Sequence, residues 1–274
     1  MASTSEESVQ VKTLSHAAKQ RMASSPGEPL FIADWEKVLM IHYQVDPHKL
    51  QKLVPFELDL LDGSAFISIV AFTMRGMRPR FGGHLGALLL KPIATHEFLN
   101  VRTYVRNGSE TGIYFLAEWL SNRLSVAIGP RAFGLPYVCG RLDYQHRWQE
   151  LALGGCVVDA ETQHQFTYHG ALDHKLKFAP CGAGSVEEWL MERYTAYTHS
   201  AGCERFFRVW HPPWQQMPVE IKVTDQSLLN VRWPLFRDSH LLGSNFSPGV
   251  GHVWMGRPHR LHDAEGRAPR VPDQ

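Results

Sequence analysis

Four stretches rich in Ile, Val, Phe and Tyr constrain this fold most strongly, because several of them are apolar on both faces. These stretches are residues 35–45, 65–74, 93–106 and 112–119. A half-exposed strand alternates apolar and polar side chains, whereas a strand covered on both faces does not. The dipeptides Asp62-Gly63 and Asn107-Gly108 each lie between two such stretches and predict hairpin turns. The sequence therefore predicts a closed or sandwiched sheet.

Two helices are predicted beside this sheet. Asp46 can cap a first helix over residues 47–54, because Pro47 at its first position needs no hydrogen-bond acceptor. Ser185 and Glu188 form a capping box for a second helix over residues 186–198. The Gly-rich, basic stretch 75–91 is predicted to be a loop that could cover a site.

The domain boundaries follow from composition. Residues 29–256 are predicted to form a single β-rich α+β domain of ordinary size. Residues 1–28 end in a Ser-Ser-Pro-Gly linker-like segment and are predicted to be a flexible N-terminal arm. Residues 257–274 combine prolines with charges and are predicted to be a flexible C-terminal tail.

Charge and cysteine content exclude several classes of protein. With 28 basic and 27 acidic side chains, no net field attracts nucleic acid or an anionic membrane surface. No stretch approaches the roughly 20 apolar residues of a membrane span, so we expect a cytoplasmic protein. The four cysteines form no Cys-x-x-Cys pair, so we predict neither a metal site nor a cofactor. A homo-oligomer is compatible with the sequence.

Several segments resemble a known superfamily. The segments similar to acetoacetate decarboxylase-like proteins are residues 41–55, 95–99 and 129–137. A closer resemblance is to the YqjF-like family of uncharacterised bacterial proteins within that superfamily, carried by residues 98–105, 135–137, 192–194 and 211–214. The resemblance implies a β-barrel or cone with flanking helices, whose interior holds a small carboxylate or carbonyl compound. It implies no particular reaction.

The departures from the decarboxylase pattern bear on chemistry. Tyr137 stands where the resemblance places the lysine that forms an imine, and a phenol cannot form one. Ser68 replaces an acidic residue, and the substrate-binding arginine falls near Glu36. The pocket glutamate is matched by Glu97. The sequence therefore predicts that the chain is not a Schiff-base decarboxylase.

Glu97 is also a candidate without the resemblance. Strand alternation places it on the same face as Leu99, Val101 and Val105, so its carboxylate would point toward an apolar interior. A buried carboxylate either has a raised pKa or pairs with a cation, and it can act as a general acid or base. The alternative is that Glu97 lies at the start of the strand and is solvated.

Arg131 lies between apolar stretches and is predicted to anchor a ligand carboxylate or to pair with Glu97. Arg102 falls on the other face of the Glu97 strand, toward a second layer or toward solvent. The hydroxyl of Tyr137 is predicted to line the pocket as a catalytic or a packed side chain.

Three further residues complete the predicted ligand-binding set, together with Arg131 and Arg102. They are Ser68, Arg193 on the second helix and His211 in a Pro-rich bend. His211 could supply acid–base chemistry or could simply pack against Trp214.

Three functions remain open from the sequence. The first is binding of a small organic acid or carbonyl compound in the barrel interior. The second is an acid–base enzyme that uses Glu97 and Tyr137 for enolisation, hydration or hydrolysis of a keto acid. The third is a structural or interaction protein whose polar core residues only fix the fold.

Overall fold

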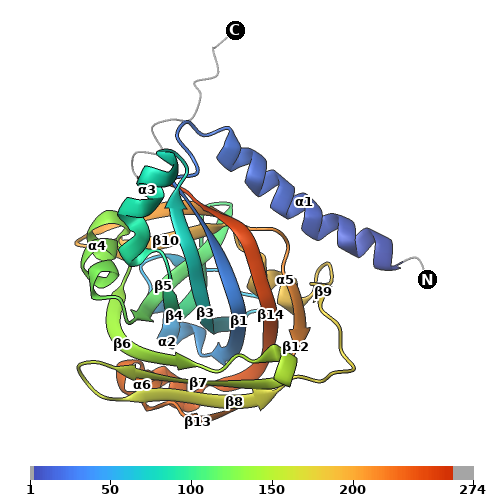
Figure 1. Cartoon of the computed structure of the whole chain (residues 1–274). Helices are drawn as coiled ribbons and strands as arrows, with labels where there is room; N and C mark the ends of the chain where they lie inside the picture. The colour runs from blue at the N-terminus through green and yellow to red at the C-terminus, as the bar shows by residue number, and fades with distance from the viewer. Residues whose placement is uncertain (1–2, 262–274) are drawn as a thin grey trace.

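Paired strands form a ring in the computed structural model, which describes residues 3–261 of the chain (Figure 1). The ring consists of β1 (Phe31–Val45), β3 (Ala65–Pro79), β4 (His96–Asn107), β5 (Glu110–Leu120), β10 (Thr195–Ser200), β11 (Cys203–Trp210) and β14 (His240–Met255). Neighbouring strands are antiparallel except β5 and β10, which run parallel where Ile113 pairs with Ala196. The four predicted strands are confirmed as β1, β3, β4 and β5.

Both predicted hairpin turns are confirmed. Asp62 and Gly63 have φ angles of 50° and 75°, as a type I′ turn requires, and they lie between the bridged residues Leu61 and Ser64. In the second turn Gly108 has a φ of 58°, between β4 and β5. The second turn joins the strand pair β4 and β5, whereas the first closes an isolated bridge just before β3.

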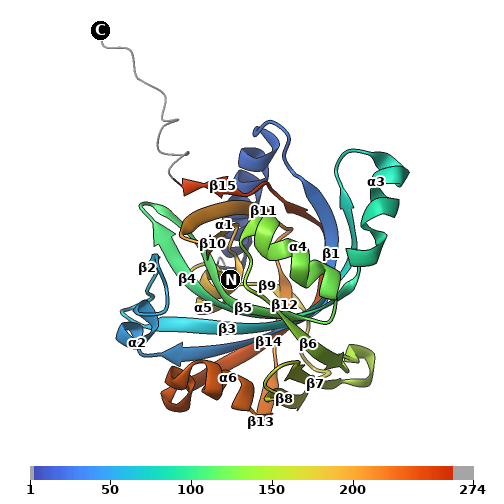
Figure 2. The same ribbon diagram turned by 90° about the vertical axis from the view of Figure 1, so that its left-hand side faces the viewer.

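A second layer covers one outer face of the ring. It consists of β6 (Tyr137–Tyr144), β7 (Ala152–Asp159), β8 (Gln165–Ala171), β13 (Glu220–Asp225), the helix α6 (Ser227–Arg232) and the 3-10 helix η3 (Pro234–Asp238). β6 joins the layer to β5 through a parallel pairing. Figures 1 and 2 show this layer on the side of the molecule away from the first helix. Its core includes Leu99 and Val101 of β4 with Val157 and Phe166.

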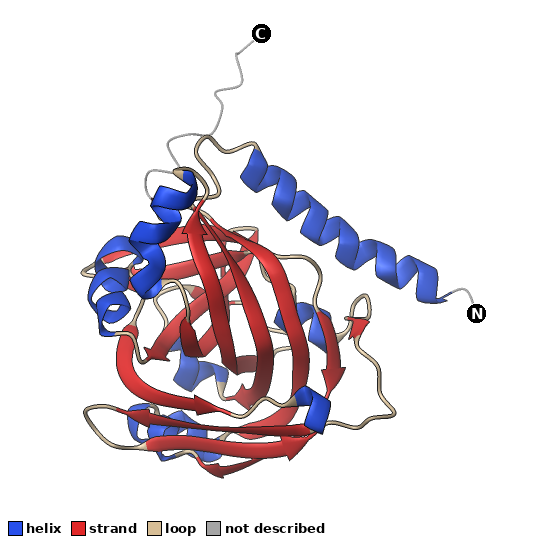
Figure 3. Cartoon of the chain, viewed as in Figure 1, coloured by secondary structure: helices blue, strands red, loops and turns tan. Residues whose placement is uncertain are grey.

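The other helices lie at the periphery of the strands (Figure 3). They are α1 (Ser3–Ala23), α2 (Pro47–Gln51), α3 (Gly83–Leu90), α4 (Arg123–Phe133) and α5 (Val186–Met191), with the 3-10 helices η1 (Lys91–Ile93) and η2 (Trp148–Glu150). The remaining strands of the described residues are short: β2 (Glu57–Leu58), β9 (Ala179–Pro180), β12 (Gln215–Pro218) and β15 (His259–Arg260). Within residues 3–261, no helix combines the length and the apolar character that crossing a membrane requires.

The predicted caps are present, but both helices are shorter than predicted, and the first, expected over residues 47–54, ends at Gln51. Asp46 accepts hydrogen bonds from the backbone of His48 and Lys49, and the Ser185 hydroxyl accepts one from the Glu188 backbone at 3.1 Å. The second helix was predicted to reach residue 198, but α5 ends at Met191 and residues 195–200 form β10. The β-branched and aromatic residues of that segment favour a strand.

The stretch 75–91 is not the predicted loop. β3 continues to Pro79, and residues 83–90 form α3 because they include four leucines and an alanine, which are good helix formers. Three of the four leucines are exposed: Leu85, Leu88 and Leu89 retain 73%, 62% and 77% of their accessible surface.

The N-terminal segment is helical, and its second half packs on β11, unlike the predicted flexible arm. Ala18 and Met22 are buried against Trp210. The Trp210 indole donates to the Ser15 carbonyl at 3.0 Å, and the Lys19 ammonium lies 4.3 Å from the centre of the indole ring. The arm is therefore docked over these residues.

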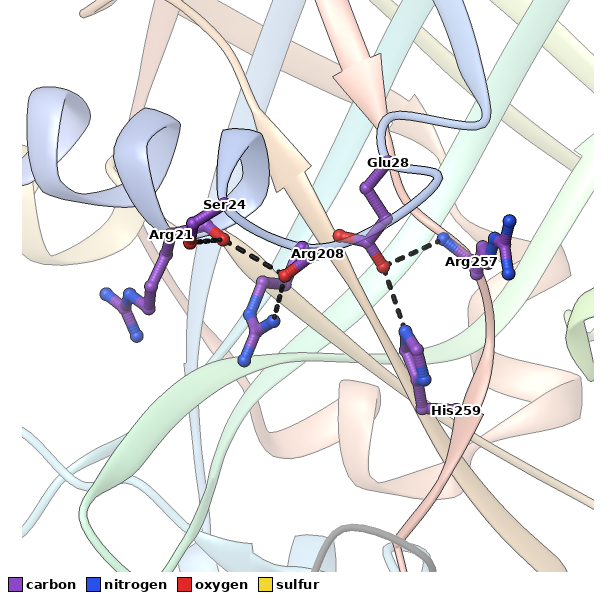
Figure 4. A network of polar contacts seen from close by, with 7 residues as sticks. Arg21, Ser24, Glu28, Arg208, Arg257 and His259 are labelled. Atoms are coloured by element: carbon purple, nitrogen blue, oxygen red, sulfur yellow. Dashed lines mark hydrogen bonds and ion pairs between the residues drawn. The ribbon is translucent and has the colours of Figure 1, made fainter. Parts of the chain in front are cut away.

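A buried carboxylate fixes the end of this segment (Figure 4). Glu28 is 1% exposed and contacts the His259 ring at 2.9 Å and the Arg257 backbone N–H at 3.3 Å. These contacts hold the first residues of the predicted C-terminal tail in place, and His259 lies in β15. The rest of that predicted tail, residues 262–274, lies outside the described residues.

Candidate functional site

The ring encloses a cavity of about 290 Å³. Its lining comes from strands β1, β3, β4, β5, β6, β10, β11 and β14, from α3, η1 and α4, and from the residues that follow α4, α5 and β11. Most of the lining side chains are aliphatic or aromatic, including Trp35, Phe72, Phe115 and Trp214. The polar lining residues are His96, Asn100, Arg102, Glu118, Ser125, Tyr137, Arg193, Thr195 and His211. A few convergent polar groups in an apolar cavity are typical of a small-molecule site.

Strand alternation and one bulge place the polar groups of β4 and β5. Four even-numbered residues of β4 line the cavity, namely His96, Phe98, Asn100 and Arg102, while the odd-numbered Leu99, Val101 and Val105 belong to the core shared with the second layer. A register shift after Val101 pairs Arg102 with Phe115 and leaves Asn100 opposite Glu118. The bulge therefore lets both Phe115 and Glu118 face the same cavity.

Arg102 is a buried guanidinium that has no carboxylate partner among the described residues. It is 8% exposed. Its Nη2 contacts only the Met40 sulfur at 3.7 Å and the Leu190 carbonyl at 3.5 Å, and its Nε has no partner. A buried charge of this kind is costly unless something pairs with it. Arg102 is thus able to bind an anionic group in the cavity.

Glu118 is the acidic side chain of the cavity. It is 4% exposed, and its Oε1 has no hydrogen-bond partner. Burial raises the pKa of the Glu118 carboxyl to about 8, and the positive charge of Arg102 opposes part of that rise. A carboxyl group with a pKa near the working pH can donate or accept a proton. Glu118 can therefore serve as a general acid or base.

Tyr137 lies beside Glu118, because β6 pairs with β5 through these two residues. Burial, together with the nearby Glu118 charge, holds the pKa of the Tyr137 phenol well above its ordinary range. The phenol therefore stays protonated and can donate a hydrogen bond to a ligand oxygen. Gly129 of α4 allows this packing, since a side chain there would overlap the Tyr137 ring.

Arg193 and His211 line the same cavity but are held by protein contacts. Arg193 pairs with Asp59 at 2.7 Å and donates to the Trp189 carbonyl at 2.6 Å. The His211 ring donates to the Pro212 carbonyl at 2.8 Å and stacks on Tyr194. Burial lowers the pKa of His211 to about 4, so the ring is neutral near pH 7.

The chain matches one family over most of its length. The profile of DUF2071, described as an uncharacterized conserved protein, matches residues 32–242. The chain belongs to the DUF2071 family. The uncharacterized protein YqjF of Bacillus subtilis (strain 168) is 28% identical over 194 residues, which are 69% of this chain and 76% of that protein. The YqjF-like resemblance is therefore confirmed.

Solved structures show the same fold as this DUF2071 chain. Acetoacetate decarboxylase from Legionella pneumophila superposes with a TM-score of 0.58 at 12% identity, over 89% of this chain and 95% of that one. The enduracididine biosynthesis enzyme MppR, solved in complex with pyruvate, gives a TM-score of 0.57 at 14% identity, over 88% and 94% of the two chains. The predicted strand-rich α+β fold of acetoacetate decarboxylase-like proteins is confirmed.

The structure brings only some of the predicted site residues together. Arg102, Tyr137, Arg193 and His211 line the cavity. Ser68 is fully buried, but it is not a lining residue: its hydroxyl bridges the His42 ring at 2.7 Å and the Tyr104 phenol at 2.5 Å. The Tyr104 hydroxyl in turn donates to the Leu190 carbonyl, so Ser68 supports the strands that carry Arg102.

The structure does not place Glu97 or Arg131 in the cavity. Glu97 shares a face of β4 with Leu99 and Val101, which pack against the second layer outside the ring. Arg131 is exposed on α4, and its guanidinium donates to the Ala127 carbonyl at 2.7 Å. The predicted pair of Arg131 and Glu97 is absent from the ion pairs of the described residues. The helical turn of α4 directs Arg131 outward, although its neighbours Gly129 and Ala132 line the cavity.

Sequence reasoning missed Glu118, Asn100 and His96. Glu118 lies between the buried residues Ala117 and Trp119, so a buried carboxylate could be predicted for Glu118 on the same grounds as for Glu97. His96 is 6% exposed, and burial lowers its pKa to about 4. Only the fold shows which face of β4 encloses the cavity.

Proposed function

We propose that the cavity binds a small organic acid or carbonyl compound, with Arg102 as the anchor for an anionic or carbonyl oxygen. The observation that carries this proposal is the buried Arg102 guanidinium, which lacks a carboxylate partner among residues 3–261 and faces the cavity. A guanidinium suits a carboxylate because its planar N–H groups match the two oxygens. Asn100 and Tyr137 supply further hydrogen-bonding groups near Glu118.

The lining also supports binding without imine formation. Among the residues that the structure describes, no lysine lines the cavity. The fold neighbour MppR is solved with pyruvate, a small keto acid, which agrees with the proposed class of ligand. For this chain we propose noncovalent binding.

A thermal-shift titration with short keto acids, hydroxy acids and simple carboxylates tests the proposal. Ligand at one hundred times its dissociation constant stabilises the native state by about 2.7 kcal/mol. We expect a saturable upward shift in wild type that Arg102→Met removes. The exposed Arg131→Met is the matched control and should keep the shift. No shift with any compound, from a folded protein, would favour a structural or interaction role.

A second function, acid–base turnover of a keto acid, is favoured by Glu118. Its pKa of about 8 lies in the range in which a group exchanges protons near neutral pH. The phenol of Tyr137 is placed beside it as a hydrogen-bond donor. With a compound that binds, proton NMR should show deuterium exchange or depletion in wild type and neither in Glu118→Gln, while binding persists. Binding without exchange or depletion in wild type would leave the chain a binding protein.

A further inference from the structure

The charged groups of the cavity gather at one end of the ring. Arg102 lies opposite Phe115 in the β4–β5 strand pair. Arg193 lies close enough for its guanidinium charge and that of Arg102 to repel each other. Glu118 lies two residues further along the β4–β5 pair, opposite Asn100. This end lies toward the start of β3, because Arg102 pairs with Ser68. A ligand headgroup that binds Arg102 therefore lies at the end of the cavity nearer the start of β3.

The opposite end of the cavity is apolar. Phe31 and Val209 flank Met255, with which each of them pairs. The Phe133 ring of α4 lies 6.2 Å from the Phe31 ring at this end. The polar lining groups nearer to it, His96 and Ser125, are uncharged at neutral pH. The charged side chains therefore lie toward one end of the cavity, and apolar or uncharged side chains line the other end.

The volume exceeds what a short acid fills. At roughly 30 Å³ for each water-sized group, a cavity of about 290 Å³ holds on the order of ten non-hydrogen atoms. Pyruvate and acetoacetate supply only about six or seven, so either would leave apolar wall uncovered. The aliphatic and aromatic side chains of the lining therefore favour a ligand with an apolar body.

We infer that the ligand is an amphipathic monocarboxylic acid, with its carboxylate at Arg102 and an aliphatic or aromatic body of about seven carbons directed toward Phe31, Val209 and Met255. The inference rests on the proposed function and names the class of ligand for the same site. Each methylene buried in such a wall tightens binding about fourfold.

Calorimetric titration with butyrate, hexanoate, octanoate and decanoate, each below its micelle concentration, tests the inference. The dissociation constant should fall on the order of tenfold for each two-carbon step up to octanoate and then level off, because octanoate fills the volume. Equal binding of butyrate and octanoate would overturn the inference and leave the proposed function standing. No binding of any acid would overturn both.

A variant that fills the apolar end tests where the body lies. Val209→Phe should weaken octanoate at least tenfold and leave butyrate within about twofold of wild type. The matched control is Val231→Phe, because Val231 is 53% exposed on α6 and is not a lining residue of the cavity. An equal loss of affinity for butyrate and octanoate in a folded Val209→Phe protein would contradict the proposed orientation. If Val209→Phe does not fold, the wild-type series alone decides the inference.

Discussion

Arg102 and Glu118 face one cavity from neighbouring strands, yet no ion pair joins them in the described part of the chain. Each keeps capacity for another partner, because the Nε of Arg102 and the Oε1 of Glu118 lack hydrogen bonds. A buried guanidinium whose only task is to stabilise a fold normally pairs directly with an acidic side chain. Their separation favours a ligand between or beside them.

The pH dependence of stability should report Glu118. Its pKa is about 8 in the folded state against 4.5 ordinarily, so between these values the folded state binds a proton that the unfolded state has released. Stability contributed by this group therefore falls as pH rises from about 5 to 8, by about 1.4 kcal/mol per pH unit. Glu118→Gln should remove that fall, as measured by urea unfolding at several pH values.

Buried histidines change the stability with pH in the opposite direction to Glu118. The contribution of Glu118 is therefore measured as the difference in stability between wild type and Glu118→Gln at each pH. Burial lowers the pKa of His42 to about 3 and that of His146 to about 4, which makes stability rise with pH up to about 6.5. These contributions cancel when wild type is compared with Glu118→Gln. Parallel curves for the two proteins between pH 5 and 8 would show that the Glu118 carboxyl is not held protonated.

Two arginines of the cavity should differ in their effect on stability. Arg193→Met breaks a buried pair with Asp59 and should lower the free energy of unfolding by roughly 3–5 kcal/mol. Arg102→Met removes a buried guanidinium without a carboxylate partner and should cost no stability, or even raise it. Chemical unfolding of both variants measures the contrast. A large loss for Arg102→Met would assign Arg102 a structural role.

Docking of α1 should depend on Met22, which is fully buried against Trp210. Met22→Ala leaves a gap that costs roughly 2–5 kcal/mol of packing. Trypsin should then cleave after Lys19 and Arg21 at least tenfold faster than in wild type, because the helix opens more often. The control is Leu14→Ala, whose side chain is 44% exposed. Equal cleavage rates for Met22→Ala and wild type would show that α1 does not rely on this contact.

Closure of the ring should depend on Gly112. A Cβ at this position would lie 2.4 Å from the Thr195 carbonyl oxygen, across the parallel contact of β5 and β10. Gly112→Ala should lower stability by roughly 1–3 kcal/mol, seen as a lower thermal midpoint. Gly154→Ala on β7 is the matched control, since its nearest atom would be 3.8 Å away. A Gly112→Ala midpoint equal to that of the control would contradict the close approach.

Local signals allowed much of the fold to be predicted. Apolar stretches and the turn at Asp62-Gly63 predicted the ring strands, and Asp46 and Ser185 predicted two helix starts. These features depend on neighbours in sequence. The helix that begins after Ser185 ended early because the next strand, β10, pairs with β5, which is distant in sequence, as well as with the adjacent β11.

The candidate site was less predictable, because both faces of β4 are apolar. Alternation separates Glu97 from Arg102, but only the pairing of β5 with β10 makes the Arg102 face the inside of the ring. Arg131 was expected to point inward because it lies between apolar stretches, whereas it lies on the exposed side of α4. Packing between distant segments decided both outcomes.

A crystal structure with octanoate, or with another acid that binds in titration, tests the central claim most directly. We expect ligand density in the ring cavity, with a carboxylate oxygen within about 3.2 Å of an Arg102 nitrogen and the body directed toward Met255. A ligand bound elsewhere, or one in the cavity whose carboxylate avoids Arg102, would contradict it.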